Sequence, residues 1–339
     1  MKKAFISICI PSYNRPETLV RLLESIDAAD SKDIEIVICE DKSPKREEIR
    51  AVVDKFNKKS DYKIIYEENK ENLGYDANLR ELANNAGSEW IVYMGDDDAF
   101  ISGALDKLIV FLKERSELGY VLRSYNIIHQ NGGIERFRYF DGNKFFEPGL
   151  NSYISLFRKS VFISGFTIKR DLIRPYLINK FDGTLLFQLY LAAEVILKYS
   201  SAYFNEPLTC QYDKELKPEF GSSAAEKKFY TPGIVTIENS VNFMKGFLKI
   251  TEFLDKKYNF NSAEIIKKDI SKYSYPVLSI QRDKGLKTFL RYVKELNKLG
   301  FNITIYYYIY IIALIFLGKR ICDSLIQIIK NILGKTPKL

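Results

Sequence analysis

Three consecutive aspartates, Asp96, Asp97 and Asp98, follow an apolar run at 90–94 that is typical of a buried strand. Neighbouring carboxylates repel one another, so such a run is best accommodated where a chain leaves a strand and meets a cation. Hard divalent ions such as Mn²⁺ or Mg²⁺ prefer oxygen ligands and leave positions open for phosphate. If strand alternation continues, Asp96 and Asp98 lie on one side and Asp97 on the other. A solvated acidic turn is the alternative.

Strand-like and helix-like segments alternate through the first hundred residues. This order predicts an α/β fold with a mainly parallel, Rossmann-like sheet flanked by helices and joined by right-handed crossovers. Ligands of such sheets bind at the carboxyl ends of the strands, so the loops after Ile10, Cys39, Tyr66 and Met94 are expected to face one cleft. The predicted strands are 4–10, 34–39, 62–66 and 90–94, and the predicted helices are 15–29, 45–58 and 75–85.

The second half of the sequence is less regular. A helix is predicted from about 102 to 115, and a hairpin from 120–129 and 134–140 around the turn Asn131-Gly132-Gly133. Residues 231–299 have helical spacing of their apolar positions. These patterns predict a helical extension after the α/β part.

Four short segments carry a family resemblance. They are SICIPSYNR at 7–15, IVICEDKS at 36–43, ENLGY at 71–75 and GDDD at 95–98. In this order and spacing they resemble the family 2 glycosyltransferases with the GT-A fold. The resemblance implies a nucleotide-sugar donor, a divalent cation (Mn²⁺ or Mg²⁺) and inversion at the anomeric carbon.

The same resemblance assigns candidate site residues. It places the loop Pro11, Ser12, Tyr13, Asn14 and Arg15 in the nucleotide pocket, and Asn72, Gly74 and Asn78 near the ribose and diphosphate. It matches the metal ligand best to Asp98, together with Asp96, and puts Asp96 or Asp97 near ribose or sugar. Asp41 is expected to accept a hydrogen bond from the base, which favours a UDP or dTDP donor because uracil and thymine carry a ring N–H. Capping of the helix that starts near Pro44 is the alternative for Asp41.

An inverting transfer needs a carboxylate that takes the proton of the acceptor hydroxyl. Many family members have a Glu-Asp pair for this at the start of a helix in the second half, and this sequence has none there. Asp182, before an apolar helix-like run, is the candidate base, with Glu194 second. The alternatives are an N-cap role for Asp182 and an ion pair with Lys198 for Glu194.

The composition excludes several other classes of protein. Four widely spaced cysteines without a CxxC pair argue against a zinc site or a disulfide framework, and a single histidine, His129, argues against a Ser-His-Asp triad. The N-terminus lacks the features of a secretory signal, so the chain is expected to be cytoplasmic.

The C-terminal segment 301–339 is expected to associate with a membrane. Residues 303–317 carry no charge, and five basic residues against one acid follow them, which indicates anionic lipid or phosphate rather than nucleic acid. The apolar run is short for a spanning helix, and residues 319–330 have the pattern of an interfacial amphipathic helix. A helix pair that closes the core is the alternative. The predicted domains are 1–220 (GT-A), 221–300 (helical extension) and 301–339 (membrane-associating tail).

The sequence thus predicts a metal-dependent glycosyltransferase at the inner face of the cell membrane, acting in surface polysaccharide assembly. Its expected partners are a nucleotide-sugar donor, a glycan or polyprenyl-diphosphate-linked acceptor and the membrane surface. One alternative is a nucleotidyltransferase, which needs a Gly-rich phosphate loop that Pro11–Arg15 lacks. The other is an inactive scaffold or binding protein, an alternative that the absence of the Glu-Asp pair supports.

Overall fold

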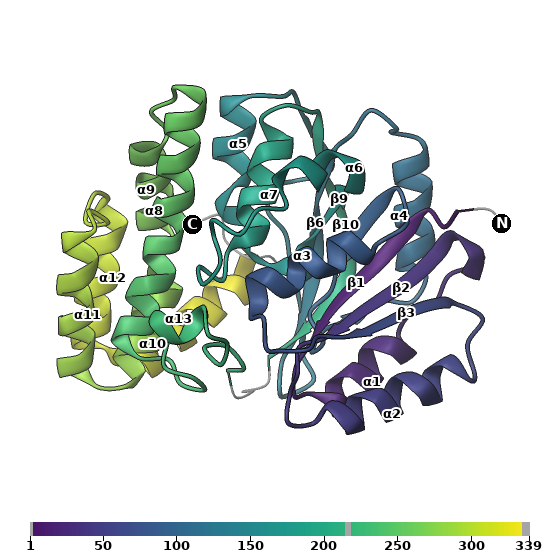
Figure 1. Cartoon of the computed structure of the whole chain (residues 1–339). Helices are drawn as coiled ribbons and strands as arrows, with labels where there is room; N and C mark the ends of the chain where they lie inside the picture. The colour runs from purple at the N-terminus through teal and green to yellow at the C-terminus, as the bar shows by residue number, and fades with distance from the viewer. Residues whose placement is uncertain (1–2, 214–217, 334–339) are drawn as a thin grey trace.

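A computed structural model describes residues 3–213 and 218–333 as a sheet with helices on both faces and a layer of further helices beside it (Figure 1). The sheet order is β3-β2-β1-β4-β9-β6-β10-β5, with β7 added to β6 and β8 added to β10. Its strands are β1 (Ile6–Ser12), β2 (Ile34–Glu40), β3 (Lys63–Glu68), β4 (Trp90–Tyr93), β5 (Ala99–Phe100), β6 (Tyr120–Ile128), β7 (Ile134–Phe137), β8 (Lys144–Phe146), β9 (Phe166–Lys169) and β10 (Ser201–Tyr212).

The first four long strands are parallel, as the alternating pattern predicted. Strand β1 pairs in parallel with β2 and β4, and β2 with β3. Strand β9 runs antiparallel to both β4 and β6, so the sheet as a whole is mixed. The parallel part aligns the carboxyl ends of β1, β2 and β4 at one edge, where the site is built.

Two hydrophobic cores lie on the two faces of the sheet. One face is covered by α1 (Pro16–Glu24), α2 (Arg46–Asn57) and α4 (Ala104–Lys113), which bury leucines and isoleucines against β1 and β2. The other face carries α3 (Tyr75–Asn85), α5 (Leu150–Leu156) and α7 (Phe187–Ile196). The short helix α6 (Arg170–Ile173) follows β9.

The C-terminal helices join this second core directly, because one continuous hydrophobic cluster runs from Cys9 in β1 to Cys322. The predicted helical stretch 231–299 is divided into four helices. The helices of this layer are α8 (Ile237–Tyr258), α9 (Ala263–Lys272), α10 (Tyr275–Asp283), α11 (Leu286–Lys298), α12 (Ile305–Phe316) and α13 (Gly318–Leu333). The domain boundaries at 220 and 300 stay a prediction. Residues 334–339 of the predicted tail lie outside the described part of the chain.

Most predicted elements are confirmed to within a few residues. The hairpin of β6 and β7 pairs antiparallel as expected, and α3 has the predicted bounds. The helix predicted at 15–29 ends at Glu24, because Ser25 caps it by donating to the carbonyl of Leu22. Among the described residues, no helix combines the length and the apolar character that crossing a membrane requires.

Candidate active site

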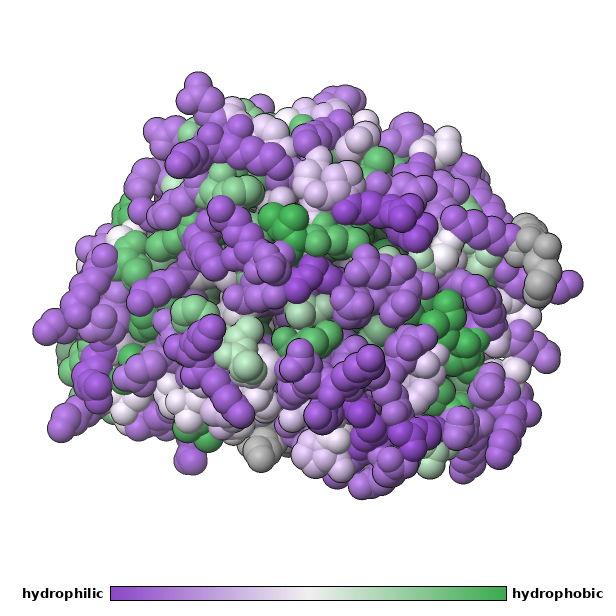
Figure 2. All heavy atoms as spheres, in the orientation of Figure 1, coloured by the Kyte–Doolittle hydropathy of each residue, from purple (hydrophilic) through white to green (hydrophobic). Residues whose placement is uncertain are grey.

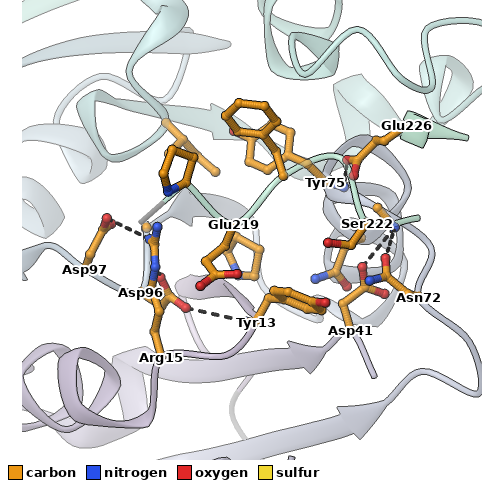
Figure 3. A pocket seen from close by; sticks show the side chains of 17 residues that line it. Tyr13, Arg15, Asp41, Asn72, Tyr75, Asp96, Asp97, Glu219, Ser222 and Glu226 are labelled. Atoms are coloured by element: carbon orange, nitrogen blue, oxygen red, sulfur yellow. Dashed lines mark hydrogen bonds and ion pairs between the residues drawn. The ribbon is translucent and has the colours of Figure 1, made fainter. Parts of the chain in front are cut away.

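A cavity of about 360 Å³ opens at the carboxyl ends of β1, β2 and β4 (Figure 3). Its walls come from the loops after these strands, from the start of α3, and from a segment at 218–226 that follows β10. Seventeen residues line it: Pro11, Tyr13, Arg15, Asp41, Asn72, Gly74, Tyr75, Asn78, Gly95, Asp96, Asp97, Ile163, Pro218, Glu219, Phe220, Ser222 and Glu226. The fold therefore brings the four segments that carry the family resemblance together at one site.

One end of the pocket is acidic and contains a single arginine side chain from the first loop. Arg15 contacts Asp97 at 2.8 Å and Asp96 at 3.4 Å, and the amide of Tyr13 donates to Asp96 at 3.4 Å. Figure 3 shows Asp96 and Asp97 on either side of the Arg15 guanidinium. Two carboxylates and one guanidinium leave net negative charge at this end.

Asp98 is held behind the pocket wall rather than in it. Its carboxylate accepts a hydrogen bond from the buried Ser164 hydroxyl, which in turn accepts from the amide of Gly95 at 2.8 Å. A Cβ on Gly95 would lie 2.9 Å from Asp97 Oδ1 and 3.2 Å from Asp98 Oδ2, so these two carboxylates converge over a glycine. The expected strand alternation was wrong, because residues 96–97 form a turn.

The opposite end of the pocket is organised by Asp41. Its carboxylate accepts hydrogen bonds from the amides of Leu73 and Gly74, both at 2.8 Å, and from the Asn69 side chain at 2.9 Å. Among the described residues, Oδ2 accepts a hydrogen bond from the Gly74 amide alone, which leaves a lone pair for a ligand. Burial raises the pKa of Asp41 to about 6, although these hydrogen bonds act in the other direction.

The first loop contributes alternate residues to the pocket. Pro11, Tyr13 and Arg15 line it, whereas Ser12 is buried in β1 and Asn14 bonds to Glu219 at 3.2 Å. The Tyr13 ring lies between Asp41 and the acidic end (Figure 3). A flat ring in this position offers a stacking surface for a base or sugar.

The segment at 218–226 forms one wall of the pocket and lies within 212–232, a stretch whose composition is compatible with either a lid over the donor or a linker. Glu226 is buried there and accepts from the amide of Tyr75 at 2.8 Å and from that of Gly221 at 2.9 Å. It thereby caps the first turn of α3 from 151 residues away. The spacing Ser223-x-x-Glu226, a capping-type pattern, was the available signal, and Ser223 Oγ does accept from the Glu226 amide.

Residues 7–172 match the model of the family described as Glycosyl transferase family 2. This part of the chain belongs to glycosyl transferase family 2. It contains the acidic turn, Asp41 and the first loop, which therefore lie within the family domain.

Curated relatives align over the same region. The chain is 31% identical over 113 residues to Abequosyltransferase RfbV of Salmonella typhimurium. It is 29% identical over 104 residues to GalNAc(5)-diNAcBac-PP-undecaprenol beta-1,3-glucosyltransferase of Campylobacter jejuni. These alignments cover 33% and 31% of this chain, and 34% and 33% of the relatives. The chain thus spans about a third of the length of the curated relatives it matches.

Solved structures show the fold beyond that region. The chain resembles crystal structures of S. aureus TarS 1-349, with a TM-score of 0.53 and 14% identity for the complex with UDP-GlcNAc, and 0.52 and 12% for the complex with UDP. Each likeness covers 85% of this chain and 81% of the other. Together with the family match, this shows the GT-A fold and its C-terminal helical region.

The acidic turn of the family 2 domain has the chemistry of a divalent-cation site. Burial, with a smaller contribution from the neighbouring Asp97, raises the pKa of Asp96 to about 7 and that of Asp98 to about 8, while Arg15 opposes the shift at Asp96. Buried carboxylates with so little opposing charge fit a cation that would neutralise them. Within 3–213 and 218–333, however, no three His, Cys, Asp or Glu side chains form a cluster that could hold a metal alone.

The two candidate bases lie outside the lining of the pocket. Asp182 forms a two-point ion pair with Arg80 of α3, and its side chain is 22% exposed. Glu194 is fully buried in α7, where Lys257 donates to it at 2.6 Å and Tyr258 also donates. Lys198, the partner expected from the sequence, is 3.7 Å away. These contacts give Glu194 a structural ion pair and leave it no open side for a substrate.

Proposed function

We propose that this chain transfers a sugar from a UDP- or dTDP-linked donor to a glycan or lipid-linked acceptor, with inversion at the anomeric carbon. The observation that carries the proposal is the pocket itself, which has a hydrogen-bond acceptor for a base at one end and an acidic turn at the other. The family membership of residues 7–172 supports the reaction class. TarS, whose fold the chain shares, has been crystallised with UDP-GlcNAc and with UDP.

In the proposed complex the base lies at Asp41 and the diphosphate at the acidic turn. The free lone pair of Asp41 Oδ2 accepts the ring N–H of uracil or thymine, and the Tyr13 ring stacks on the base. Asn72 and Asn78, which line the pocket beside Asp41, serve the ribose, and Arg15 offers a guanidinium to phosphate oxygens. Glu219 faces the same space from the opposite wall (Figure 3).

Asp96 and Asp98 are the residues that we propose hold Mn²⁺ or Mg²⁺, with phosphate oxygens completing the ligand set. When bound, such an ion supplies Lewis-acid stabilisation to the departing diphosphate. Ser164 fixes the orientation of the Asp98 carboxylate, and Gly95 leaves the space in which Asp97 and Asp98 converge.

We propose Asp182 as the base that deprotonates the acceptor. It is partly exposed just before α7, and its partner Arg80 belongs to α3, whose first residue, Tyr75, lines the pocket. Each Asp182 oxygen accepts one hydrogen bond from Arg80, which leaves a second lone pair that can accept the proton of the acceptor hydroxyl. We do not propose Glu194 as the base, because its carboxylate is buried and already accepts hydrogen bonds from Lys257 and Tyr258.

We further propose that the protein acts in surface polysaccharide assembly while attached peripherally to the cytoplasmic face of the membrane. The name of the Campylobacter relative includes a PP-undecaprenol acceptor, and that of the Salmonella relative an abequosyl group. Helix α12 exposes an apolar face, and basic Lys319 and Arg320 follow it. The visible face in Figure 2 is mostly hydrophilic, with hydrophobic residues in small separate patches.

Hydrolysis of UDP- and dTDP-sugars by the purified protein tests the central proposal. We expect slow hydrolysis that requires Mn²⁺ or Mg²⁺ and falls about 100-fold in Asp98→Asn, because a ligand charge is lost while the Ser164 contact is retained. Asp54→Asn, an exposed change on α2, is the matched control. Hydrolysis by Asp98→Asn at the wild-type rate, or the same rate in EDTA, would overturn the metal site. Absence of any binding of UDP or dTDP would overturn the donor class.

A further inference from the structure

A second cavity, of about 610 Å³, adjoins the donor pocket in the layer of C-terminal helices. Its walls come from the start of α8, the end of α10 and the first half of α11. Pro218 lines both this cavity and the donor pocket, so the two hollows meet at the segment 218–226. The volume lies within the range of about 300–1,000 Å³ that small-molecule sites occupy. The cavity therefore has room for a ligand of the size of a sugar beside the donor.

A third cavity, of about 440 Å³, continues this space between α8 and α11, two helices that pack against each other. Ile237, Glu238 and Arg291 line both of these cavities. We call the two cavities that share these residues the α8–α11 groove. Because Pro218 lines only the first of them, the groove leads from the edge of the donor pocket along the helical layer.

The α8–α11 groove has a positive excess, because its lining contains four cationic side chains and two carboxylates. One of the carboxylates, Glu295, is already paired at 2.7 Å with Lys298, which lies outside the lining. In the part of the chain that the structure describes, none of the four cationic side chains forms an ion pair. A concave surface with this charge attracts anions. The cationic residues are Lys245, Lys284, Arg291 and Lys294, and the acidic ones are Glu238 and Glu295.

Gln281 gives the α8–α11 groove a hydrogen-bond acceptor without a partner. The residue lines the first cavity although its side chain is fully buried. Its Nε2 donates to Ser240 Oγ at 2.7 Å and to the carbonyl of Thr236 at 3.3 Å, which fixes the amide, whereas Oε1 has no hydrogen-bond partner among the described residues. A buried acceptor is costly to leave unpaired. A phosphate anion cannot donate to it, but a sugar hydroxyl can.

We propose that the α8–α11 groove binds a glycosyl phosphate as the phosphate-bearing part of the acceptor. Lys284 and Arg291, which line the same cavity as Gln281, contact the phosphate, and Gln281 accepts a hydrogen bond from a sugar hydroxyl. Continuity of the two hollows at Pro218 lets the rest of the glycan extend toward the donor. This inference rests on the proposed function, because it assigns a place and a chemical class to the acceptor of the same transfer.

Calorimetric titration of N-acetylglucosamine 1-phosphate into the full chain, with its donor pocket saturated by UDP, tests the proposal. We expect saturable binding that is at least about tenfold tighter than that of N-acetylglucosamine or of inorganic phosphate. Lys284→Ala and Arg291→Ala should each weaken it about tenfold, the usual effect of losing one hydrogen bond to a charged group. Both side chains are exposed, so thermal melts should stay close to the wild type. Lys287→Ala is the matched control, because this exposed lysine of α11 lines neither cavity of the groove.

Three results would overturn the inference. The first is binding of inorganic phosphate as tight as that of the glycosyl phosphate, because the groove would then hold an anion without its sugar. The second is equal affinity for the glycosyl phosphate in the wild type, Lys284→Ala and Arg291→Ala. The third is an unchanged affinity in these variants together with weaker binding to vesicles containing phosphatidylglycerol, which would assign the groove to lipid headgroups. UDP affinity is measured separately for the same proteins. Failure of the donor proposal would mean that none of them binds UDP, whereas failure of this inference would leave UDP binding intact.

Discussion

The carboxylates of the pocket are held in different ways, and the difference separates their roles. Asp41 accepts three hydrogen bonds from one side and keeps one lone pair free, whereas Asp96 and Asp97 share Arg15. A side chain that is already oriented loses little freedom when a ligand arrives. The proposed base contact of Asp41 can therefore be tested without disturbing the acidic turn.

The raised pKa of Asp41 predicts a pH dependence of nucleotide binding. The carboxylate form prevails above about pH 6 and is lost as the pH falls through that value, so UDP affinity should fall up to tenfold per pH unit below 6. Asp41→Asn is the control, because an asparagine at position 41 cannot ionise. Titration of UDP itself affects its binding to both proteins equally. Parallel affinity–pH curves for the two proteins, measured by calorimetry from pH 5 to 8, would contradict a role for this carboxylate.

The same shift has a consequence for stability with the opposite sign. Because the folded-state pKa lies above the ordinary value of 3.8, ionisation of Asp41 costs folding free energy as the pH rises from about 4 to about 6. Asp41→Asn removes this cost, although it also weakens the hydrogen bonds to Leu73 and Gly74.

Replacement of the proposed base should affect turnover more than substrate binding. Asp182→Asn keeps the shape that Arg80 contacts but removes the basic oxygen, so kcat should fall by 100-fold or more with little change in the KM for the donor. The measurement is transfer to a lipid-linked acceptor. Glu219→Gln is the informative comparison, because Glu219 also faces the pocket. A normal kcat in Asp182→Asn together with a lowered kcat in Glu219→Gln would identify Glu219 as the base instead.

At the scale of elements, the start of α3 and the segment at 218–226 depend on each other through Gly74. Its φ of 86° and ψ of 167° belong to a region that favours glycine, and a Cβ there would lie 2.3 Å from Ser223 Oγ. Gly103, before α4, also has a positive φ but has nothing within 4 Å of its Cβ position.

Alanine at these two glycines separates backbone strain from the contact. Gly103→Ala should cost about 1 kcal/mol of unfolding free energy. Gly74→Ala should cost about 2–3 kcal/mol, because Ser223 and Glu226 must also move. It should weaken UDP binding too, since the displaced residues support the pocket wall. Denaturant unfolding of both variants measures the loss of unfolding free energy. Equal losses would show that the segment at 218–226 moves to accommodate the added methyl group at no free-energy cost.

The sequence predicted the elements whose pattern is local and missed those fixed by distant contacts. Apolar spacing located α3 and the hairpin of β6 and β7, and the acidic run was correctly placed at a strand end. The antiparallel pairing of β9 was not predictable, because its partners β4 and β6 both lie far from β9 in the sequence. Nor did a local pattern assign Glu226 to the pocket, since its partner Tyr75 lies on another element. The enclosure of Glu194 likewise depends on Lys257 of α8.

For the whole molecule, the layer of C-terminal helices joins the core on one side and exposes apolar residues on the other. Tyr307 and Leu314 of α12 are fully buried, which agrees with a helix that helps to close the core. Phe316 is 81% exposed, and Ile321, Leu325 and Ile328 of α13 are about half exposed. The core-packing interpretation of this segment therefore holds for the buried face, and the exposed face is the one on which the proposed membrane contact depends.

Exposed isoleucines of α12 should determine binding of the full chain to membranes. Ile305 and Ile312 are 68% and 57% exposed, and burying an isoleucine contributes about 2 kcal/mol, so Ile305→Ser with Ile312→Ser should reduce vesicle binding by 10-fold or more. Sedimentation with vesicles of phosphatidylcholine and phosphatidylglycerol measures the bound fraction. Ile134→Ser is the matched control, because this isoleucine is also 68% exposed but lies on β7. If both changes reduce binding equally, the interaction is a general hydrophobic one. If neither does, α12 faces something other than lipid, and a concentration-dependent change in sedimentation would identify a second copy of the chain as its partner.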